Sequence, residues 1–199
     1  MKRVVLVCAV FLLLAGLVAA PASAATKINF GLKAGLSFSN VSWSDDDGSE
    51  KMILKPTFGG FVLVPIGKGL FLQPEVNYLV TGEKWDFEGG SEAENFTYLH
   101  IPILLKYQFM EEGKVLPFIE AGPAIGFLLS ADDDGEDVKS FFKSTDFGLE
   151  VGGGVSMPAG KMKVVLDARF YLGLTNAYNF VNDYSMKNRA FSVTAGLLF

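Results

Sequence analysis

The sequence predicts an all-β protein: a closed, eight-stranded, antiparallel up-and-down β-barrel that crosses a membrane. Three observations support this: an N-terminal secretory signal, apolar and polar residues that alternate along strand-length segments, and connections that are alternately long and short. A transmembrane barrel needs this alternation because its wall faces lipid while its interior is polar. A soluble lipocalin-like barrel is the alternative at the level of the fold, and it would place the apolar side chains inside.

Residues 1–24 are predicted to be a cleaved signal peptide, and residues 25–199 form the barrel. Lys2 and Arg3 precede an apolar run over residues 4–20, and small residues at 22–24 make a cleavage site. Cys8 is the only cysteine and lies in the signal, so neither disulfides nor thiolate metal sites are expected in the mature chain. The predicted location is the bacterial outer membrane.

The charge balance is acidic. The whole chain has 17 Lys and Arg against 22 Asp and Glu, and removal of Lys2 and Arg3 leaves 15 against 22, a formal net charge of −7. Nucleic-acid binding requires a basic surface, so a nucleic-acid partner is not expected. No cofactor is expected either.

The alternation is clearest in the last predicted strand, residues 188–199. One face carries Arg189, Phe191, Val193, Ala195, Leu197 and Phe199. Ser192, Thr194 and Gly196 lie on the other face, and Leu198 is an apolar exception there. The same pattern recurs upstream, which predicts strands at 27–39, 53–65, 70–81, 95–109, 115–130, 144–157 and 162–175. Each reaches the ~9–11 residues that a tilted membrane strand needs.

The connections between these strands alternate in length. Short turns are predicted at 67–69, 111–114 and 158–161, and long polar loops follow the first, third, fifth and seventh strands, including 82–94 and 176–187. Outer-membrane barrels show this alternation because short turns face the periplasm and long loops face outward. An even number of strands also allows the sheet to close without edges.

Four prolines lie inside the predicted strands: Pro74, Pro102, Pro117 and Pro123. Proline removes a hydrogen-bond donor from the ladder, and a closed barrel has no edge strand to receive it. We therefore expect bulges or local widening near Pro102 and Pro123, or strands that end closer to these prolines than the predicted bounds.

Charged residues recur at inward positions of the predicted strands. They are Lys33, Glu75, His100, Lys106, Glu120, Glu150, Asp167 and Arg169. They could form an ion path or a proton-linked site, or they could form a salt-bridged core. An eight-stranded barrel is barely wide enough for its own side chains, and lone buried charges cost several kcal/mol, so the salt-bridged core is favoured.

His100 is the only histidine of the chain. A serine–histidine–acid lipid hydrolase would need it near the outer rim beside a serine, and no G-x-S-x-G motif accompanies it. A lone histidine does not make a catalytic constellation. No catalytic residue is therefore assigned, the protein is predicted not to be an enzyme, and a lipid-modifying enzyme is the least favoured hypothesis.

The outer loops are strongly acidic and hold 15 of the 22 acidic residues. The densest runs are Asp45, Asp46, Asp47, Asp132, Asp133, Asp134, Glu136 and Asp137. They could bind Ca²⁺ or Mg²⁺, bridge to anionic lipopolysaccharide, or dock a basic partner; the simpler interpretation is solvated loops. Neither Asp-Asp-Asp-Gly run fits the D-x-D-x-D-G calcium loop, so no metal ligand is assigned.

Several stretches resemble a known family. They are Tyr98-Leu-His-Ile-Pro-Ile-Leu-Leu-Lys-Tyr107, Pro117-Phe-Ile-Glu-Ala-Gly-Pro-Ala-Ile-Gly126, Asp146-Phe-Gly-Leu-Glu-Val-Gly-Gly-Gly-Val155 and Arg169-Phe-Tyr-Leu-Gly-Leu-Thr-Asn176. Together they resemble the PorT-like outer-membrane β-barrel domain of Bacteroidetes-type bacteria. The resemblance implies a small integral outer-membrane barrel. Most such proteins have no assigned activity and a few are tied to secretion machinery, and no catalytic residue carries over.

The favoured function is a structural or interaction barrel that displays acidic loops, supports the envelope or binds a partner. The alternative is a transport or secretion-accessory barrel, which leaks small solutes or docks periplasmic machinery through its turns. The expected partners are outer-membrane lipid, the barrel-assembly machinery through the C-terminal strand ending at Phe199, and an envelope or extracellular partner.

Overall fold

A computed structural model describes residues 28–43, 51–87, 90–110, 112–178 and 185–199; at residues 43, 51, 85–87 and 90–92 only the backbone is described. The predicted signal peptide at 1–24 lies outside the described residues. Asp45, Asp46 and Asp47 of the first predicted loop lie outside them as well.

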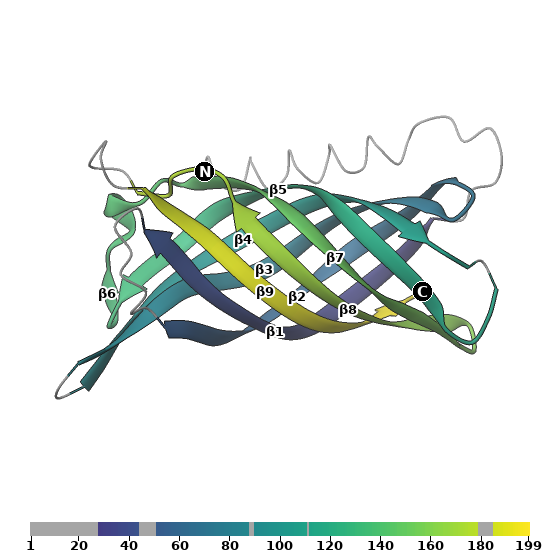
Figure 1. The fold of residues 1–199 in the computed structure, drawn as a ribbon, viewed down its shortest axis with the longest axis horizontal. Coiled ribbons are helices and arrows are strands. Elements are labelled where there is room, and N and C mark those ends of the chain that lie inside the picture. The colour runs from purple at the N-terminus through teal and green to yellow at the C-terminus, as the bar shows by residue number, and fades with distance from the viewer. Residues whose placement is uncertain (1–27, 44–50, 88–89, 111, 179–184) are drawn as a thin grey trace.

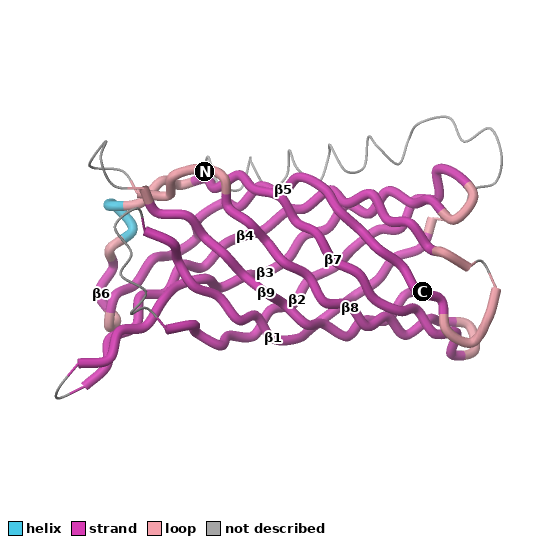
Figure 2. Tube along the Cα trace, in the orientation of Figure 1, coloured by secondary structure: helices cyan, strands magenta, loops and turns pink. Residues whose placement is uncertain are grey.

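Eight long strands close into a barrel, which confirms the predicted fold (Figures 1 and 2). They are β1 (Asn29–Trp43), β2 (Lys51–Gly67), β3 (Leu70–Phe87), β4 (Gly90–Gln108), β5 (Leu116–Asp133), β7 (Thr145–Ala159), β8 (Met162–Gly173) and β9 (Met186–Leu198). The order is β4-β3-β2-β1-β9-β8-β7-β5, and an additional β4–β5 pairing closes the sheet. Every pairing is antiparallel.

Two small elements follow β5. The strand β6 (Glu136–Asp137) pairs with the end of β5, and the 3₁₀ turn η1 (Lys139–Phe141) precedes β7. Within the described residues, no helix has the length and apolar character needed to cross a membrane. We call the end of the barrel that carries the short turns and the C-terminus the turn end, and the opposite end, which carries β6, the loop end (Figure 1).

The side chains alternate as a membrane barrel requires. Ile103, Leu166 and Phe170 are about 40 % exposed on the outside, whereas Glu75 and Arg169 are almost completely buried in the lumen. Outward apolar and inward charged residues are the reverse of a lipocalin-like barrel, so that alternative is wrong.

At the loop end, β3 and β4 continue as a hairpin that is paired as far as Phe87 and Gly90. Figure 1 shows this hairpin projecting beyond the rest of the barrel. The loop predicted over 82–94 is therefore mostly strand, and that prediction was wrong. The polar composition of this segment suggested a loop. Outside the lipid, however, two strands can pair through their backbones without a row of apolar side chains. In the same way, β5 extends to Asp133 and pairs with β6 across a tight turn at 134–135.

The expected bulges are absent at Pro102 and Pro123, whereas the alternative of local widening there stays a prediction. Pro102 pairs with Ala124 and Leu105 with Ala121, so both strands advance by three residues across Pro102 and Pro123. A proline removes a donor but occupies the same length of strand as any other residue. Register shifts do occur in β2, between Met52 and Phe58 on either side of Pro56 and between Pro65 and Gly67, and also at Thr97 and Tyr98 of β4.

The interior has three layers. A cluster of apolar side chains closes the loop end: Val41, Phe96, Tyr98, Leu128, Ala131, Phe142, Ala177 and Met186. A second apolar cluster closes the turn end: Phe61, Leu63, Phe118, Val165 and Leu198. Leu198, the apolar exception in its strand, is explained by its place in this cluster. The charged residues lie between the two clusters.

Candidate functional site: the charged layer of the lumen

Arg169 of β8 is the centre of the charged layer. Its Nε lies 2.6 Å from Glu120 Oε1 and 3.1 Å from Asp167 Oδ1. Its Nη1 lies 2.8 Å from Glu75 Oε2 and 3.2 Å from Glu150 Oε1. The planar guanidinium presents several donors at fixed angles, which suits one cation shared among four carboxylates. Because these carboxylates come from β3, β5, β7 and β8, Arg169 ties together strands on several sides of the lumen.

Glu75 is the most heavily hydrogen-bonded of these carboxylates. Lys33 Nζ donates to Glu75 Oε2 at 2.6 Å, and the side-chain amides of Gln73 and Asn77 donate to it at 2.6 and 2.9 Å. All four residues are buried. A buried carboxylate that accepts several charge-assisted or amide hydrogen bonds is well compensated for the loss of water.

Lys106 is held differently. Its Nζ lies 3.4 Å from the centroid of the Phe118 ring and 4.0 Å from the nearest oxygen of Glu120. A cation over an aromatic face is stabilised by the ring quadrupole, more strongly when both are desolvated. Phe118 belongs to the turn-end cluster, so Lys106 joins the charged layer to that apolar closure.

His100 lies inside the lumen, where its Nε2 is 2.7 Å from Glu150 Oε2 and its ring packs edge-on against Tyr171 at 4.7 Å. It is only 3 % exposed. A lipid on the outer wall of the barrel cannot reach this side chain, which weakens the hypothesis of a lipid-modifying enzyme.

The structure thus brings together all eight inward charged residues predicted from the sequence. It also adds Asp146, which accepts hydrogen bonds from Tyr171 Oη at 3.0 Å, Thr175 Oγ1 at 2.8 Å and Asn188 Nδ2 at 2.8 Å. Neither Asp146 nor Asn188 was predicted as a site residue. The alternation could have identified Asp146, because it occupies an inward position two residues before Gly148 and four before Glu150.

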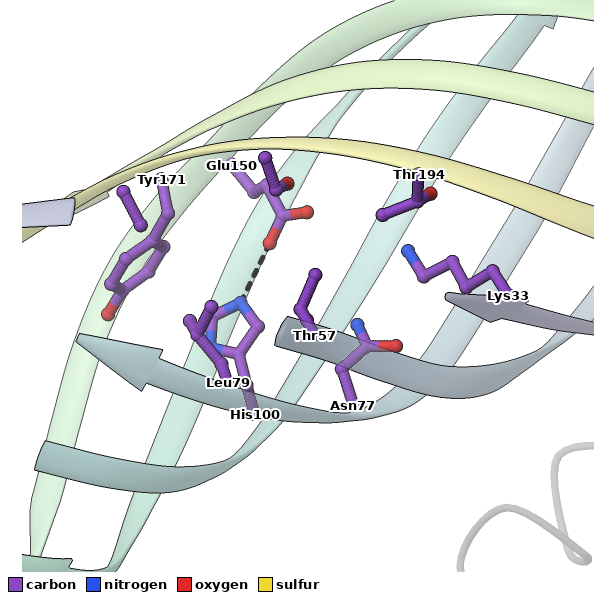
Figure 3. Close-up of a pocket in the computed structure, with 10 residues that line it drawn as sticks. Lys33, Thr57, Asn77, Leu79, His100, Glu150, Tyr171 and Thr194 are labelled. Carbon is purple, nitrogen blue, oxygen red and sulfur yellow. Dashed lines mark hydrogen bonds and ion pairs between the residues drawn. The ribbon is translucent and has the colours of Figure 1, made fainter. Parts of the chain in front are cut away.

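A cavity of about 20 Å³ lies in the charged layer (Figure 3). Its lining includes Lys33, Asn77, His100, Glu150 and Thr194. The buried Oδ1 of Asn77 has no hydrogen-bond partner within the described part of the chain. This volume accommodates about one water molecule. It is far too small for a solute path.

Both ends of the lumen are closed by packed side chains. At the loop end, the Phe142 ring packs edge-on against Phe96 at 4.6 Å, and Phe142 forms a β-bridge with Tyr178. Lys139 Nζ donates to the carbonyl oxygens of Leu128 and Leu129, which fastens the segment after β6 to the top of β5. The segments after β5 and after β8 therefore fold together across the mouth of the barrel.

The described acidic residues of the loop end fall into two groups. Asp134, Glu136 and Asp137 are exposed, whereas Asp132 and Asp133 are half-buried at the end of β5. Glu94 is 8 % exposed at the base of the projecting hairpin; burial and the neighbouring Asp133 and Asp132 raise its pKa to about 7. Among the described residues, no group of three or more His, Cys, Asp or Glu is arranged to hold a metal ion.

Comparison with known proteins identifies the family. Residues 20–179 match the family described as outer membrane protein beta-barrel domain. The chain belongs to this family. It is therefore an outer-membrane β-barrel protein, while the narrower PorT-like assignment stays a prediction.

Two solved structures show the same fold. Neisserial surface protein A (NspA) is 20 % identical, with a TM-score of 0.53 over 85 % of this chain and 95 % of that one. OprG, an outer membrane protein from Pseudomonas aeruginosa, is 11 % identical, with a TM-score of 0.54 over 87 % of this chain and 97 % of that one. No curated protein matches the sequence. At these identities the likeness extends to the fold alone.

Proposed function

We propose that this protein is a non-conducting outer-membrane barrel of the structural or interaction type. The observation that carries this proposal is the closed interior: Arg169 binds carboxylates from several strands, and apolar clusters fill both ends. A lumen packed in this way contributes stability and leaves the outer surface as the part that can meet partners. The outer surface includes the projecting β3–β4 hairpin and the exposed Asp134, Glu136 and Asp137.

The acidic loop end favours a basic partner or a divalent cation. Exposed carboxylates at the loop end create a negative potential that attracts cationic groups over roughly a Debye length, about 8 Å at physiological salt. The half-buried Asp132 and Asp133 add to this potential at the foot of the hairpin.

The alternative is a secretion-accessory barrel that docks periplasmic machinery through its short turns. Lys68, Lys114 and Lys161 are exposed on three such turns and would meet an acidic partner. A PorT-like relationship would fit this alternative. A solute leak fits the structure poorly, because the cavity in the charged layer holds about one water molecule.

Conductance in planar bilayers tests the closed lumen. The wild-type protein should give no steady channel, because neither the charged layer nor the apolar clusters leave a continuous water path. The double variant Phe61→Ala/Phe118→Ala removes two rings from the apolar cluster at the turn end and so opens that end in part. Its conductance is compared with that of the wild type. A steady conductance of the wild-type protein in its folded form would contradict the proposal.

Crosslinking in intact outer membranes tests where partners bind. Two charge-matched triple variants are compared with the wild type: Asp134→Asn/Glu136→Gln/Asp137→Asn at the loop end, and Lys68→Gln/Lys114→Gln/Lys161→Gln at the turn end. Loss of crosslinks in the first variant alone supports an outer interaction surface. Loss in the second alone supports periplasmic docking and contradicts the favoured function.

A further inference from the structure

Three exposed basic side chains gather at one side of the loop end: Lys143, Lys187 and Arg189, which we call the basic sector. Backbone hydrogen bonds bring their segments together. The Lys143 amide donates to the Ala177 carbonyl at 2.8 Å, and the Ala177 amide donates to the Met186 carbonyl at 2.9 Å. The segment around Ala177 therefore lies between that of Lys143 and that of Lys187, and Arg189 follows two residues along β9.

Lys187 and Arg189 point toward the outside of the barrel. Their neighbours Met186 and Asn188 are fully buried on the lumen side, and side chains alternate along a strand. Below Arg189 the outward row of β9 is apolar from Phe191 to Phe199. Lys187 and Arg189 are thus the charged continuation of a lipid-facing row.

The depth of these residues can be estimated from strand geometry. At about 3.3 Å per residue and a tilt near 40°, the apolar row from Phe191 to Phe199 is about 20 Å tall. Arg189 lies about 5 Å higher, at the upper edge of the ~25 Å apolar band of such barrels, and Lys187 about 5 Å above that. In an outer-membrane protein, this is the level of the outer-leaflet headgroups.

The basic sector has no internal counter-charge on its own strands. The carboxylates of β7 and β8, namely Asp146, Glu150 and Asp167, all point into the lumen and are buried. The stretches Asn29–Trp43 and Met186–Leu198 contain no acidic residue. Within the part of the chain that the structure describes, the side chains of Lys143, Lys187 and Arg189 form no hydrogen bond or ion pair.

The opposite side of the loop end has the opposite charge. Asp132 and Asp133 end β5, Asp134 and Glu136 flank the turn after it, and Glu94 lies on β4. Among the described residues of the loop end, the acidic side chains therefore lie over β4 and β5 and the basic ones beside β7 and on β9. A uniformly acidic surface would repel anionic headgroups on all sides, whereas this arrangement leaves one side suited to them.

We propose that the basic sector binds the phosphate groups of anionic glycolipids in the outer leaflet. Arg189 can bind phosphate through two parallel hydrogen bonds, and Lys143 and Lys187 act as point charges beside it. The apolar row beneath them packs against the acyl chains of the same lipid. The site would fix the lipid shell on one side of the barrel and leave the acidic side free for other partners.

Titration of the detergent-solubilised protein with lipopolysaccharide tests this site. The ligands are phosphorylated lipopolysaccharide, the same lipopolysaccharide after removal of its phosphates, and inorganic phosphate. The test variant is Lys143→Gln/Lys187→Gln/Arg189→Gln, and the control is Lys68→Gln/Lys114→Gln/Lys161→Gln, which changes the charge equally at the turn end. Bound lipid is measured by native mass spectrometry, and folding by the heat-dependent gel shift.

The test variant should bind phosphorylated lipopolysaccharide at least about tenfold more weakly than the wild type, because it loses three cations that attract the anionic headgroup. The control should bind like the wild type, and removal of the lipid phosphates should abolish the difference between them. Equal binding by the test variant, equal loss in the control, or binding of inorganic phosphate as tight as that of the lipid would overturn the proposal. If the triple variant does not fold, Lys187→Gln/Arg189→Gln is tested in the same way.

Discussion

The lumen and the loop end both contain several carboxylates, but they place them in opposite surroundings. In the lumen, Glu75, Glu120, Glu150 and Asp167 each have a Lys or Arg nitrogen within 3.2 Å. At the loop end, Asp134 and Glu136 are exposed to water. Desolvated charges must be paired, whereas water compensates an exposed charge without any partner. The difference teaches that a carboxylate in this barrel depends on a cationic partner only where the fold encloses it.

The sharpest way to break this comparison is to remove the shared cation. Arg169→Gln should destabilise the barrel by about 3–5 kcal/mol or prevent its folding, because four buried carboxylates lose a partner. Urea unfolding of the protein in lipid bilayers measures the effect. Lys161→Gln, an exposed change at a turn, is the control and should stay within about 0.5 kcal/mol. A loss below about 1 kcal/mol for Arg169→Gln would show that the network is not structural.

Glu94 lies between the two regions and should show an intermediate, pH-dependent effect. Its pKa is raised from 4.5 to about 7 in the folded hairpin by burial and by Asp133 and Asp132. When the hairpin opens, the ordinary pKa returns, so the open form loses its proton at lower pH than the folded form. The folded hairpin is therefore most stable at low pH. Its stability falls as the pH rises from about 4.5 to about 7, and Glu94 causes no further change above that pH.

Hydrogen exchange of the β3–β4 hairpin amides at pH 5 and pH 8, corrected for intrinsic rates, measures this effect. Protection should fall between these pH values in the wild type and stay constant in Glu94→Gln. The backbone amides that hydrogen-bond between β8 and β9 serve as an internal reference. Equal pH dependence in the wild type and in Glu94→Gln would assign the effect to another group.

The smallest effects are expected at the exposed loop end. Asp134→Asn, Glu136→Gln and Asp137→Asn should each change the free energy of unfolding by no more than about 0.5 kcal/mol. Neutralising one of several neighbouring acidic residues removes repulsion between them, so each substitution should stabilise the folded protein slightly. The same urea assay measures the change. A loss near 2 kcal/mol at any of the three would mean that the loop end, like the lumen, depends on its carboxylates.

The alternation of residues predicted much of the interior. Lys33, Glu75, Lys106 and Arg169 occupy inward positions because side chains alternate along a strand whose other face meets lipid. The partners could not be read from spacing. Arg169 and Glu75 lie 94 residues apart, and they meet because the sheet closes and both side chains reach the centre of a narrow lumen.

The sequence misled where lipid no longer constrains it. The hairpin ending at Phe87 and Gly90 lacks a clear apolar row, yet it is paired along its length. The bulge expected at Pro102 and Pro123 was wrong, because both strands keep their length across these two prolines. The shifts in register occur around Pro56 and Pro65 of β2 and at Thr97 and Tyr98 of β4.

By itself, the sequence determined that this chain forms a membrane barrel with eight strands and which faces of its strands turn inward, because lipid outside and a polar interior impose a period of two on every strand. Only the tertiary structure decided that four carboxylates share Arg169, that both ends of the lumen are filled, and that acidic and basic side chains of the described loop end lie on different sides. These features depend on the register and closure of the sheet. Register and closure bring together residues that are far apart in the chain, and a local sequence pattern does not show which distant residues will meet.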